Sequence, residues 1–261
     1  MPLFYHRIAD SRLNGWTMRY RDFARQIRWL RQHFDLISFE ELLRRLREGN
    51  YRPAVSVTFD DGYADNCVRA LPLLIDEGVP CTYFIATDHI VTGRSFPHDL
   101  ARGEACPPNS PDQIRALAEQ GIEIGAHTRT HADLGTITDP AQLESEIIAA
   151  KQEVEALSGR PCRYMAFPYG QPRNLSPAAF RLAREAGYEA VCTAYGGYNF
   201  PGDDPFHLQR IHADPDMVRL RNWLSLDPRK VRMVQRYQYA APDETLLEAN
   251  AEQTELSGVL S

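Results

Sequence analysis

Short runs of apolar residues alternate with segments of helical periodicity along most of the 261-residue chain. Residues 54–59, Ala-Val-Ser-Val-Thr-Phe, form a run typical of a strand that is buried on both faces. From Phe23 to Phe34, in contrast, apolar side chains recur at every third or fourth position, which is the spacing of one helix face. The pattern predicts strands over residues 3–6, 35–38, 54–59, 79–87, 122–127, 163–167, 188–193 and 206–212. It predicts helices over residues 18–34, 39–47, 65–77, 111–120, 140–157, 177–186 and 215–225.

Strands that alternate with helices in this order favour parallel βαβ units, and therefore an α/β fold. About seven such units in succession favour a single (β/α)-barrel of about seven parallel strands, with an open doubly wound sheet as the alternative. In a barrel, the active site is expected at the C-terminal ends of the strands. We assign residues 1–225 to this barrel. Residues 226–261 are expected to form a weakly packed C-terminal helix and tail, because residues 241–261 are polar and acidic.

Two further features bear on a binding site. Residues 89–109 form a long stretch rich in glycine, proline and charged residues, which we interpret as an irregular loop facing the substrate. Three tryptophans, Trp16, Trp29 and Trp223, could stack on sugar rings, although their spacing is more typical of helix cores.

Composition and charge exclude several classes of protein. Hydrophobic residues make up 43% and charged residues 25% of the chain, as in ordinary globular domains. The net charge of -6 gives no electrostatic footprint for nucleic acid. Five cysteines without a C-x-x-C spacing favour reduced thiols. With no signal-like apolar segment and no long apolar run, we expect a cytoplasmic protein without a transmembrane segment.

The buried strand 54–59 ends on two adjacent carboxylates, Asp60 and Asp61. Carboxylates are seldom buried unless they are paired or bind a metal, and two neighbouring ones raise each other's pKa unless a cation intervenes. The strand 122–127 ends in the same way on His127, which is followed four residues later by His131. One carboxylate with two histidines is a common ligand set for a catalytic metal with open positions for water. We therefore expect a metal site on the barrel rim.

A third segment, Cys-Arg-Tyr-Met-Ala-Phe-Pro-Tyr-Gly-Gln at residues 162–171, completes a pattern. The motifs T-F-D-D-G at 58–62, H-T-x-T-H at 127–131 and R-x-x-x-x-P-Y-G at 163–170 resemble the first three motifs of the polysaccharide deacetylases. This family is also called the NodB-homology group or carbohydrate esterase family 4. The resemblance covers residues 3–225 and implies a distorted (β/α)-barrel that removes N- or O-acetyl groups from sugars.

The resemblance also implies a role for each motif residue. Asp61, His127 and His131 would bind a divalent metal, commonly zinc, and Asp60 would be the general base. The backbone N–H of Tyr169 would help to hold the oxyanion. These roles suit the chemistry, because a metal lowers the pKa of bound water and polarises the carbonyl of a poorly electrophilic amide. The expected substrate is an N-acetylated sugar or polysaccharide.

The sequence departs from the family pattern at two positions. Ala166 stands where the third motif usually has an arginine that orients the base, so Arg163 or Arg210 must take its place. The late motif, Leu-x-His in the family, reads Arg210-Ile211-His212, with His212 as the implied general acid. Since side chains alternate along a strand, Arg210 and His212 share one face, and we predict that Arg210 contacts Asp60. His6, in a Tyr-His-x-Ile opening, lies either on the rim or in a structural position.

Two other functions fit part of this pattern. A non-catalytic barrel that only binds glycans is favoured by the missing arginine at Ala166, but not by the presence of every metal ligand and the base. An iron oxygenase with two histidines and one carboxylate would use the same ligand types, but it would leave Asp60 without a role. A metal-dependent carbohydrate N-deacetylase explains more of the residues.

Overall fold

The computed structural model of this chain describes residues 1–233 and 236–239. Its main sheet contains a row of strands in the order β10-β9-β8-β7-β6-β5-β1-β11, and all neighbours pair in parallel. These strands are β1 (Pro2–Tyr5), β5 (Ala54–Phe59), β6 (Cys81–Ile85), β7 (Glu123–Ala126), β8 (Tyr164–Ala166), β9 (Ala190–Cys192), β10 (His207–Leu208) and β11 (Ile211–His212). A further strand, β4 (Asp35–Leu36), pairs with β5, and β2 (Arg7–Ile8) pairs with β3 (Thr17–Met18) outside this sheet.

One extended segment, residues 207–212, borders both ends of this row. Its first part, β10, pairs with β9, and its second part, β11, pairs with β1. The row therefore closes on itself, and the eight elements amount to seven strands when 207–212 is counted as one. This arrangement confirms the predicted barrel and rejects the open sheet.

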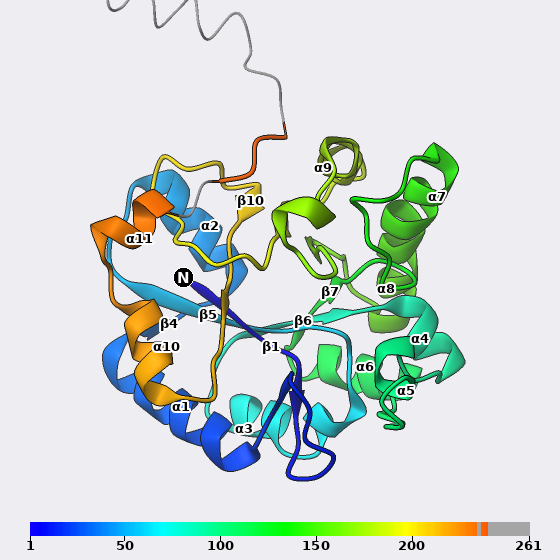
Figure 1. Cartoon of the computed structure of the whole chain (residues 1–261), viewed down its shortest axis with the longest axis horizontal. Coiled ribbons are helices and arrows are strands. Elements are labelled where there is room, and N and C mark those ends of the chain that lie inside the picture. Colours follow the sequence, from blue (N-terminus) through cyan, green and yellow to red (C-terminus); the bar gives the residue numbers. More distant parts are fainter. Residues whose placement is uncertain (234–235, 240–261) are drawn as a thin grey trace, which may run out of the picture.

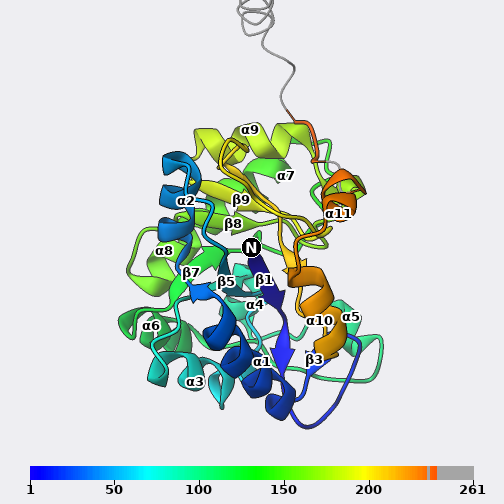
Figure 2. The same ribbon diagram turned by 90° about the vertical axis from the view of Figure 1, so that its left-hand side faces the viewer.

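Helices surround the strands (Figures 1 and 2). They are α1 (Tyr20–His33), α2 (Phe39–Glu48), α3 (Ala70–Asp76), α4 (Thr87–Thr92), α5 (Pro97–Leu100), α6 (Pro111–Glu119), α7 (Pro140–Glu144), α8 (Ala150–Ser158), α9 (Pro177–Glu185), α10 (Met217–Leu224) and α11 (Pro228–Met233). A π-helical turn, η2 (Ser145–Ala149), joins α7 to α8, and short 3-10 turns form η1 (Ala64–Cys67) and η3 (Pro172–Asn174). None of the helices in the described ranges is long and apolar enough to span a membrane.

Local sequence signals explain where several helices begin and end. The Ser38 side chain accepts a hydrogen bond from the Glu41 N–H at the start of α2, and Gly49 ends that helix in the left-handed conformation. Ser110 and Gln113 form a capping box at the start of α6, as predicted. The stretch 89–109 differs from the prediction, because it contains most of α4 and all of α5. Both helices are too short to show a clear periodicity.

The tail expected after residue 225 begins with α11. Residues 236–239 contact the barrel: Arg236 pairs with Asp203 at 2.9 Å, and the ring of Tyr239 stacks on Phe180 at 4.1 Å. The segment 241–261, for which we expect weak packing, lies outside the described residues.

A buried histidine beside this contact makes stability depend on pH. His207 is 0% exposed, and burial, aided by the charge of Arg236, lowers its pKa from 6.5 to about 3. Between these two pKa values, His207 is protonated in the unfolded chain and neutral in the folded chain. The free energy of unfolding therefore decreases as the pH drops below about 6.5. Between pH 7.5 and pH 5, His207 alone should cost about 2 kcal/mol of unfolding free energy. Urea unfolding at several pH values should show that the unfolding free energy of His207→Gln depends less on acid pH than that of the parent. The variant His33→Gln, which changes an exposed histidine, should behave as the parent does. Equal pH dependence in all three proteins would contradict this assignment.

Candidate active site

The residues singled out from the strand ends come together at one rim of the barrel. Asp60 and Asp61 follow β5, and His127 follows β7, so all three residues lie at the carboxyl ends of parallel strands. With His131 they line a pocket of about 340 Å³. This volume lies at the small end of the range for small-molecule sites.

Asp61 faces both histidines. Its Oδ1 atom lies 3.4 Å from Nε2 of His127 and 3.2 Å from Nε2 of His131. The opposite nitrogen of His127, Nδ1, lies 2.8 Å from the carbonyl oxygen of Ala166, to which it must donate a proton. Neutral His127 therefore presents the lone pair of Nε2 towards a carboxylate oxygen. Nε2 of His127 and Oδ1 of Asp61 are then two acceptors that face each other, and a cation between them would stabilise the arrangement.

The electrostatics of the site favour such a cation. The side chain of Asp61 is almost fully buried, and its Oδ1 has no hydrogen-bond partner within the described residues. Burial alone would raise the pKa of the Asp61 carboxyl, but positive charge on the imidazoles of His127 and His131 would lower it well below the usual value, and a metal ion would supply that charge when the imidazoles are neutral. Ligand atoms of Asp61, His127 and His131 all lie within 4.8 Å of one another. The donor set therefore fits a divalent metal.

The backbone is strained around these ligands. Of the five non-glycine residues with positive φ in the described chain, four belong to the three motifs: Asp61 (73°), Thr128 (61°), His131 (61°) and Tyr169 (61°). Such conformations persist only where the surrounding structure holds them, and they concentrate at functional sites. The turn that contains Asp61 and the turn that contains His131 are thus held in position by tertiary contacts.

The predicted contact between Arg210 and Asp60 is confirmed. The guanidinium forms two parallel hydrogen bonds with the carboxylate, 2.6 Å from Nη1 to Oδ1 and 2.8 Å from Nη2 to Oδ2. Arg210 also donates to Oγ1 of Thr58 and to the carbonyl oxygen of Thr193, both at 3.1 Å. Burial alone would raise the pKa of Asp60, but the charge of Arg210 keeps it below the usual value. Asp60 is therefore an ionised carboxylate in a fixed orientation.

Strand alternation explains how Arg210 reaches the barrel interior. Arg210 is 0% exposed and lies between two rings, with its guanidinium carbon 4.9 Å from the centre of Phe4 and 5.3 Å from that of Phe84. Leu208, two residues earlier, packs in the same inner cluster as Phe84. Ile211, on the other face, belongs to the outer core between the strands and the helices. This matches the predicted alternation.

The other arginine considered for this role, Arg163, does not reach the site. It precedes β8, at the opposite end of the barrel, and pairs with Glu123 at 2.6 Å and Glu40 at 3.2 Å. As the first residue before the strand, it lies a whole strand length from the rim. Arg163 is therefore excluded as the partner of Asp60.

The third motif ends in a tight turn against the next strand. Gly170 has a φ of 58°, and a Cβ atom at this position would lie 2.7 Å from the backbone nitrogen of Ala194. Only glycine fits there, and the carbonyl oxygen of Gly170 accepts the Ala194 N–H at 2.9 Å. Tyr169, just before it, is exposed and lines the pocket, with its ring 5.1 Å from that of His131.

Two imidazoles lie on the side of Arg210. His212 is exposed, and its ring centre lies 6.3 Å from that of His6 and 5.2 Å from that of Phe4. His6 lines the pocket that holds the two carboxylates, which answers the open question about its position in favour of the rim. His212 instead lines a small neighbouring cavity. The proton donor implied by the family pattern therefore lies at the edge of the site.

Two pocket residues could not be assigned to the site from the sequence with their contact partners. Trp16 and His98 both line the pocket and pack edge to face, with ring centres 4.9 Å apart. The spacing of Trp16 is more typical of a core residue than of one that stacks on sugars, and His98 has no role of its own within the stretch 89–109 that we interpret as facing the substrate. They come from segments about 80 residues apart, so no local spacing signals their contact.

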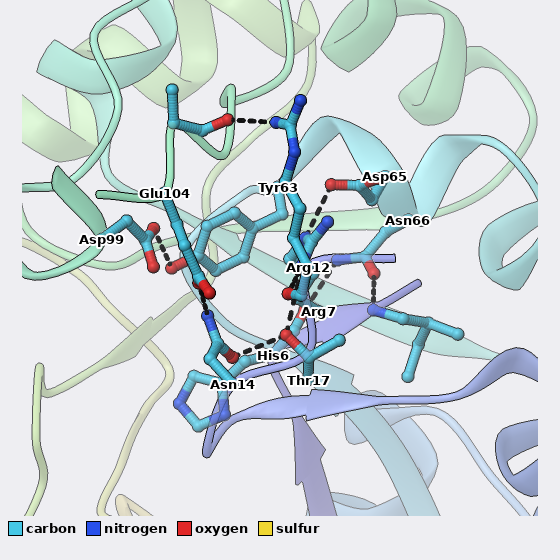
Figure 3. A network of polar contacts seen from close by, with 12 residues as sticks. His6, Arg7, Arg12, Asn14, Thr17, Tyr63, Asp65, Asn66, Asp99 and Glu104 are labelled. Carbon is cyan, nitrogen blue, oxygen red and sulfur yellow. Dashed lines mark hydrogen bonds and ion pairs between the residues drawn. The ribbon is translucent and has the colours of Figure 1, made fainter. Parts of the chain in front are cut away.

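A polar network ties these two segments together (Figure 3). Arg7 is buried, donates to the carboxylate of Asp65 at 2.7 Å and holds the carbonyl oxygen of Arg12 at 2.7 Å. Arg12 donates to the carbonyl oxygen of Ala105, and Asn14 donates to Glu104 at 3.1 Å. The segment around Trp16 and the predicted substrate-facing segment thereby form one wall of the pocket.

Comparisons with known proteins agree with this architecture. A family model described as polysaccharide deacetylase matches residues 48–191, more than half of the chain. YxkH of Bacillus subtilis (strain 168), whose name assigns it to the polysaccharide deacetylases, is 26% identical over 219 residues, which are 82% of this chain and 71% of that protein. A chitooligosaccharide deacetylase of Bradyrhizobium sp. (strain ANU 289) is 29% identical over 45% of this chain and 46% of its own length. The structure of IcaB from Ammonifex degensii shares the fold, with a TM-score of 0.70 at 24% identity over 85% of this chain and 95% of that chain.

The closed parallel barrel and these matches define a carbohydrate deacetylase with a (β/α)-barrel fold. The chain belongs to the polysaccharide deacetylase family, as its three motifs indicated.

Proposed function

We propose that this protein hydrolyses the N-acetyl group of an amino sugar with the help of a divalent metal, of which zinc is the first candidate. The observation that carries this proposal is the arrangement of two carboxylates. Asp61 faces the Nε2 atoms of two histidines, whereas the neighbouring Asp60 is held by an arginine. One carboxylate is thus available to a metal and the other to a proton.

The chain's own groups account for the reaction steps. Asp61, His127 and His131 would hold the metal, which supplies an activated water and polarises the substrate carbonyl. Asp60 accepts the proton of the attacking water, and the Tyr169 N–H helps to stabilise the oxyanion. Arg210 keeps Asp60 ionised and fixed in orientation. The leaving amine takes a proton from His212 at the edge of the site, whose ring lies beside that of His6 in the pocket lining.

A barrel that only binds glycans is the second candidate, because Ala166 lacks the family's usual arginine. The bidentate contact of Arg210 argues against it, since the base is oriented after all. An iron oxygenase would use the same three ligand types, but an ionised, arginine-held Asp60 has no place in that chemistry.

Metal and acetate measurements on the purified chain test the proposal. We expect one zinc per chain and acetate release from N-acetylated sugars, tested as monosaccharide, chitooligosaccharide, nucleotide-linked and lipid-linked acceptors. Activity should be lost after chelation and should return when zinc is added, because the water is activated at the metal. Zinc-loaded protein that binds these sugars and releases no acetate would favour the glycan-binding barrel. Consumption of dioxygen by an iron-loaded protein would favour the oxygenase.

A further inference from the structure

The turn that separates the two histidines is held in an unfavourable conformation. Thr128 and His131 both have a φ of 61°, in the left-handed region that β-branched residues rarely adopt. Such conformations persist only where the surrounding structure holds them, so the turn 128–131 depends on its contacts with other elements.

The two histidines depend on this turn to different degrees. His127 follows β7 directly, its N–H donates to the carbonyl oxygen of Ile85, and its ring is fixed by Ala166. The ring of His131 packs against Phe96 and Tyr169, with centres 5.4 Å and 5.1 Å away, but it has no comparable hydrogen bond within the described residues. The position of the His131 ring therefore depends on the turn that precedes it.

Backbone groups of the turn are tied on two sides. On one side its carbonyl oxygens accept hydrogen bonds from the first residues of α4: Thr128 from the Thr87 N–H at 3.4 Å, and Arg129 from the Asp88 N–H at 2.8 Å. On the other side its amides donate to a single carboxylate, that of Glu146, at 3.0 Å from Arg129 and 2.9 Å from Thr130. The hydroxyl of Thr130 adds a third hydrogen bond at 2.6 Å.

Glu146 is unusual in its own helix. It is only 4% exposed, although glutamate is seldom buried without a partner, whereas Glu144 two residues earlier is exposed. It lies in the π-helical turn η2, which interrupts the helical segment that contains α7 and α8 (Figure 1). Turns of this kind occur frequently at functional sites. Its carboxylate bonds Arg129 and Thr130, which lie between the two histidines in the sequence, and it makes no hydrogen bond to the histidine rings.

We propose that Glu146 is a positioning residue for the metal centre: its carboxylate holds the turn 128–131 and thereby sets the place of His131 opposite Asp61. The inference rests on the proposed function, because it assumes that Asp61, His127 and His131 bind the metal. Glu146 would therefore increase the affinity for the metal without contacting it. Both amides donate to one oxygen of the carboxylate, and the Thr130 hydroxyl donates to the other. A glutamine oxygen would accept the two amides without the negative charge that strengthens these hydrogen bonds, and its NH2 group could not accept from the hydroxyl.

Zinc affinity of the purified protein, measured by competition with a chromophoric chelator, tests this role without relying on activity. We expect Glu146→Gln to weaken zinc binding by about 10–100-fold, the usual effect of losing a group that orients metal ligands. Glu144→Gln removes the same charge from the exposed face of the same helical segment and should bind zinc as the parent does. A purely structural role would lower the melting temperature of metal-free Glu146→Gln and leave its zinc affinity unchanged, which would overturn the proposal.

Thr130→Val decides the question if Glu146→Gln does not fold. It removes one of the three hydrogen bonds and leaves the charge and both amide contacts in place. A several-fold loss of zinc affinity supports the proposal, and an unchanged affinity overturns it. Parent protein that binds no zinc at all would contradict the metal centre itself, so this failure is distinguishable from a failure of the role assigned to Glu146.

Discussion

Replacing Asp60 by asparagine is expected to slow acetate release by about 10²–10⁴-fold, the usual contribution of a general base. Asparagine has nearly the same shape, and its side-chain oxygen can still accept a hydrogen bond from Arg210. The three candidate ligands are untouched, so the variant should still bind one zinc per chain. The expected effect is therefore on kcat, with little change in metal content. Single-turnover acetate release and metal analysis of the same preparation measure both quantities.

Asp61→Asn provides the matched control, because it makes the same chemical change one residue further along. This variant should lose most of its zinc, since Asp61 rather than Asp60 faces the two histidines. Near-normal turnover in Asp60→Asn would remove Asp60 from the mechanism. Loss of zinc in Asp60→Asn would instead make this residue a ligand.

Much of the fold follows from signals that are local in the sequence. The apolar run 54–59, the capping box at Ser110 and the glycine at position 49 are each recognisable within a short stretch of sequence and mark an element or its end. The helices within the stretch 89–109 cannot be predicted from periodicity, because α4 and α5 have only six and four residues. Their helical conformation depends on packing of residues such as Phe96 beneath the pocket.

The site was predictable to the extent that strand ends are predictable. Carboxylates and histidines that directly follow buried strands must meet at one rim of a parallel barrel, which is why Asp60, Asp61 and His127 could be grouped in advance. Arg210 followed from strand alternation and from the need of a buried cation for a carboxylate. The positive φ of Tyr169, in contrast, could not be predicted, because nothing in the local sequence favours that conformation.

Groups that act through tertiary contacts could not be predicted. Trp16 lines the pocket from a segment that Arg12 and Asn14 tie to residues 104–105. In the sequence, Glu146 looks like an ordinary polar residue of an amphipathic helix. Only the structure shows that the turn 128–131 lies against it. In each case the partner lies on a different element, and sequence spacing carries no information about the contact.

Arg210→Met should be the most destabilising of the substitutions considered. Removing one partner of a buried ion pair leaves the other charge without compensation, which typically costs about 3–5 kcal/mol of unfolding free energy. Both side chains are almost fully buried here, at 0% and 4% exposure, and the contact is bidentate. The variant should also release acetate more slowly, because Asp60 loses the group that orients it. Urea denaturation of the metal-free protein measures the stability change without interference from zinc binding.

Arg163→Met is the matched control, since it removes the same side chain from an ion pair of similar geometry. Arg163 is 29% exposed, and such pairs contribute only about 0–1 kcal/mol. If the two arginine variants lose equal stability, burial of the Arg210–Asp60 pair is not the source of its effect.

The double variant Asp60→Asn with Arg210→Met tests whether the unpaired charge is the cause. Once Asp60 is neutral, the loss of Arg210 no longer leaves a buried carboxylate alone, so the double variant should be more stable than Arg210→Met itself. The stability losses of the two single variants should therefore add up to more than the loss in the double variant, by about 0.5–3 kcal/mol for groups in direct contact. Strict additivity would mean that Arg210 stabilises the barrel through Phe4, Phe84 and Thr193 instead of through Asp60. In that event, the departure from the family pattern at Ala166 would still need another compensating residue.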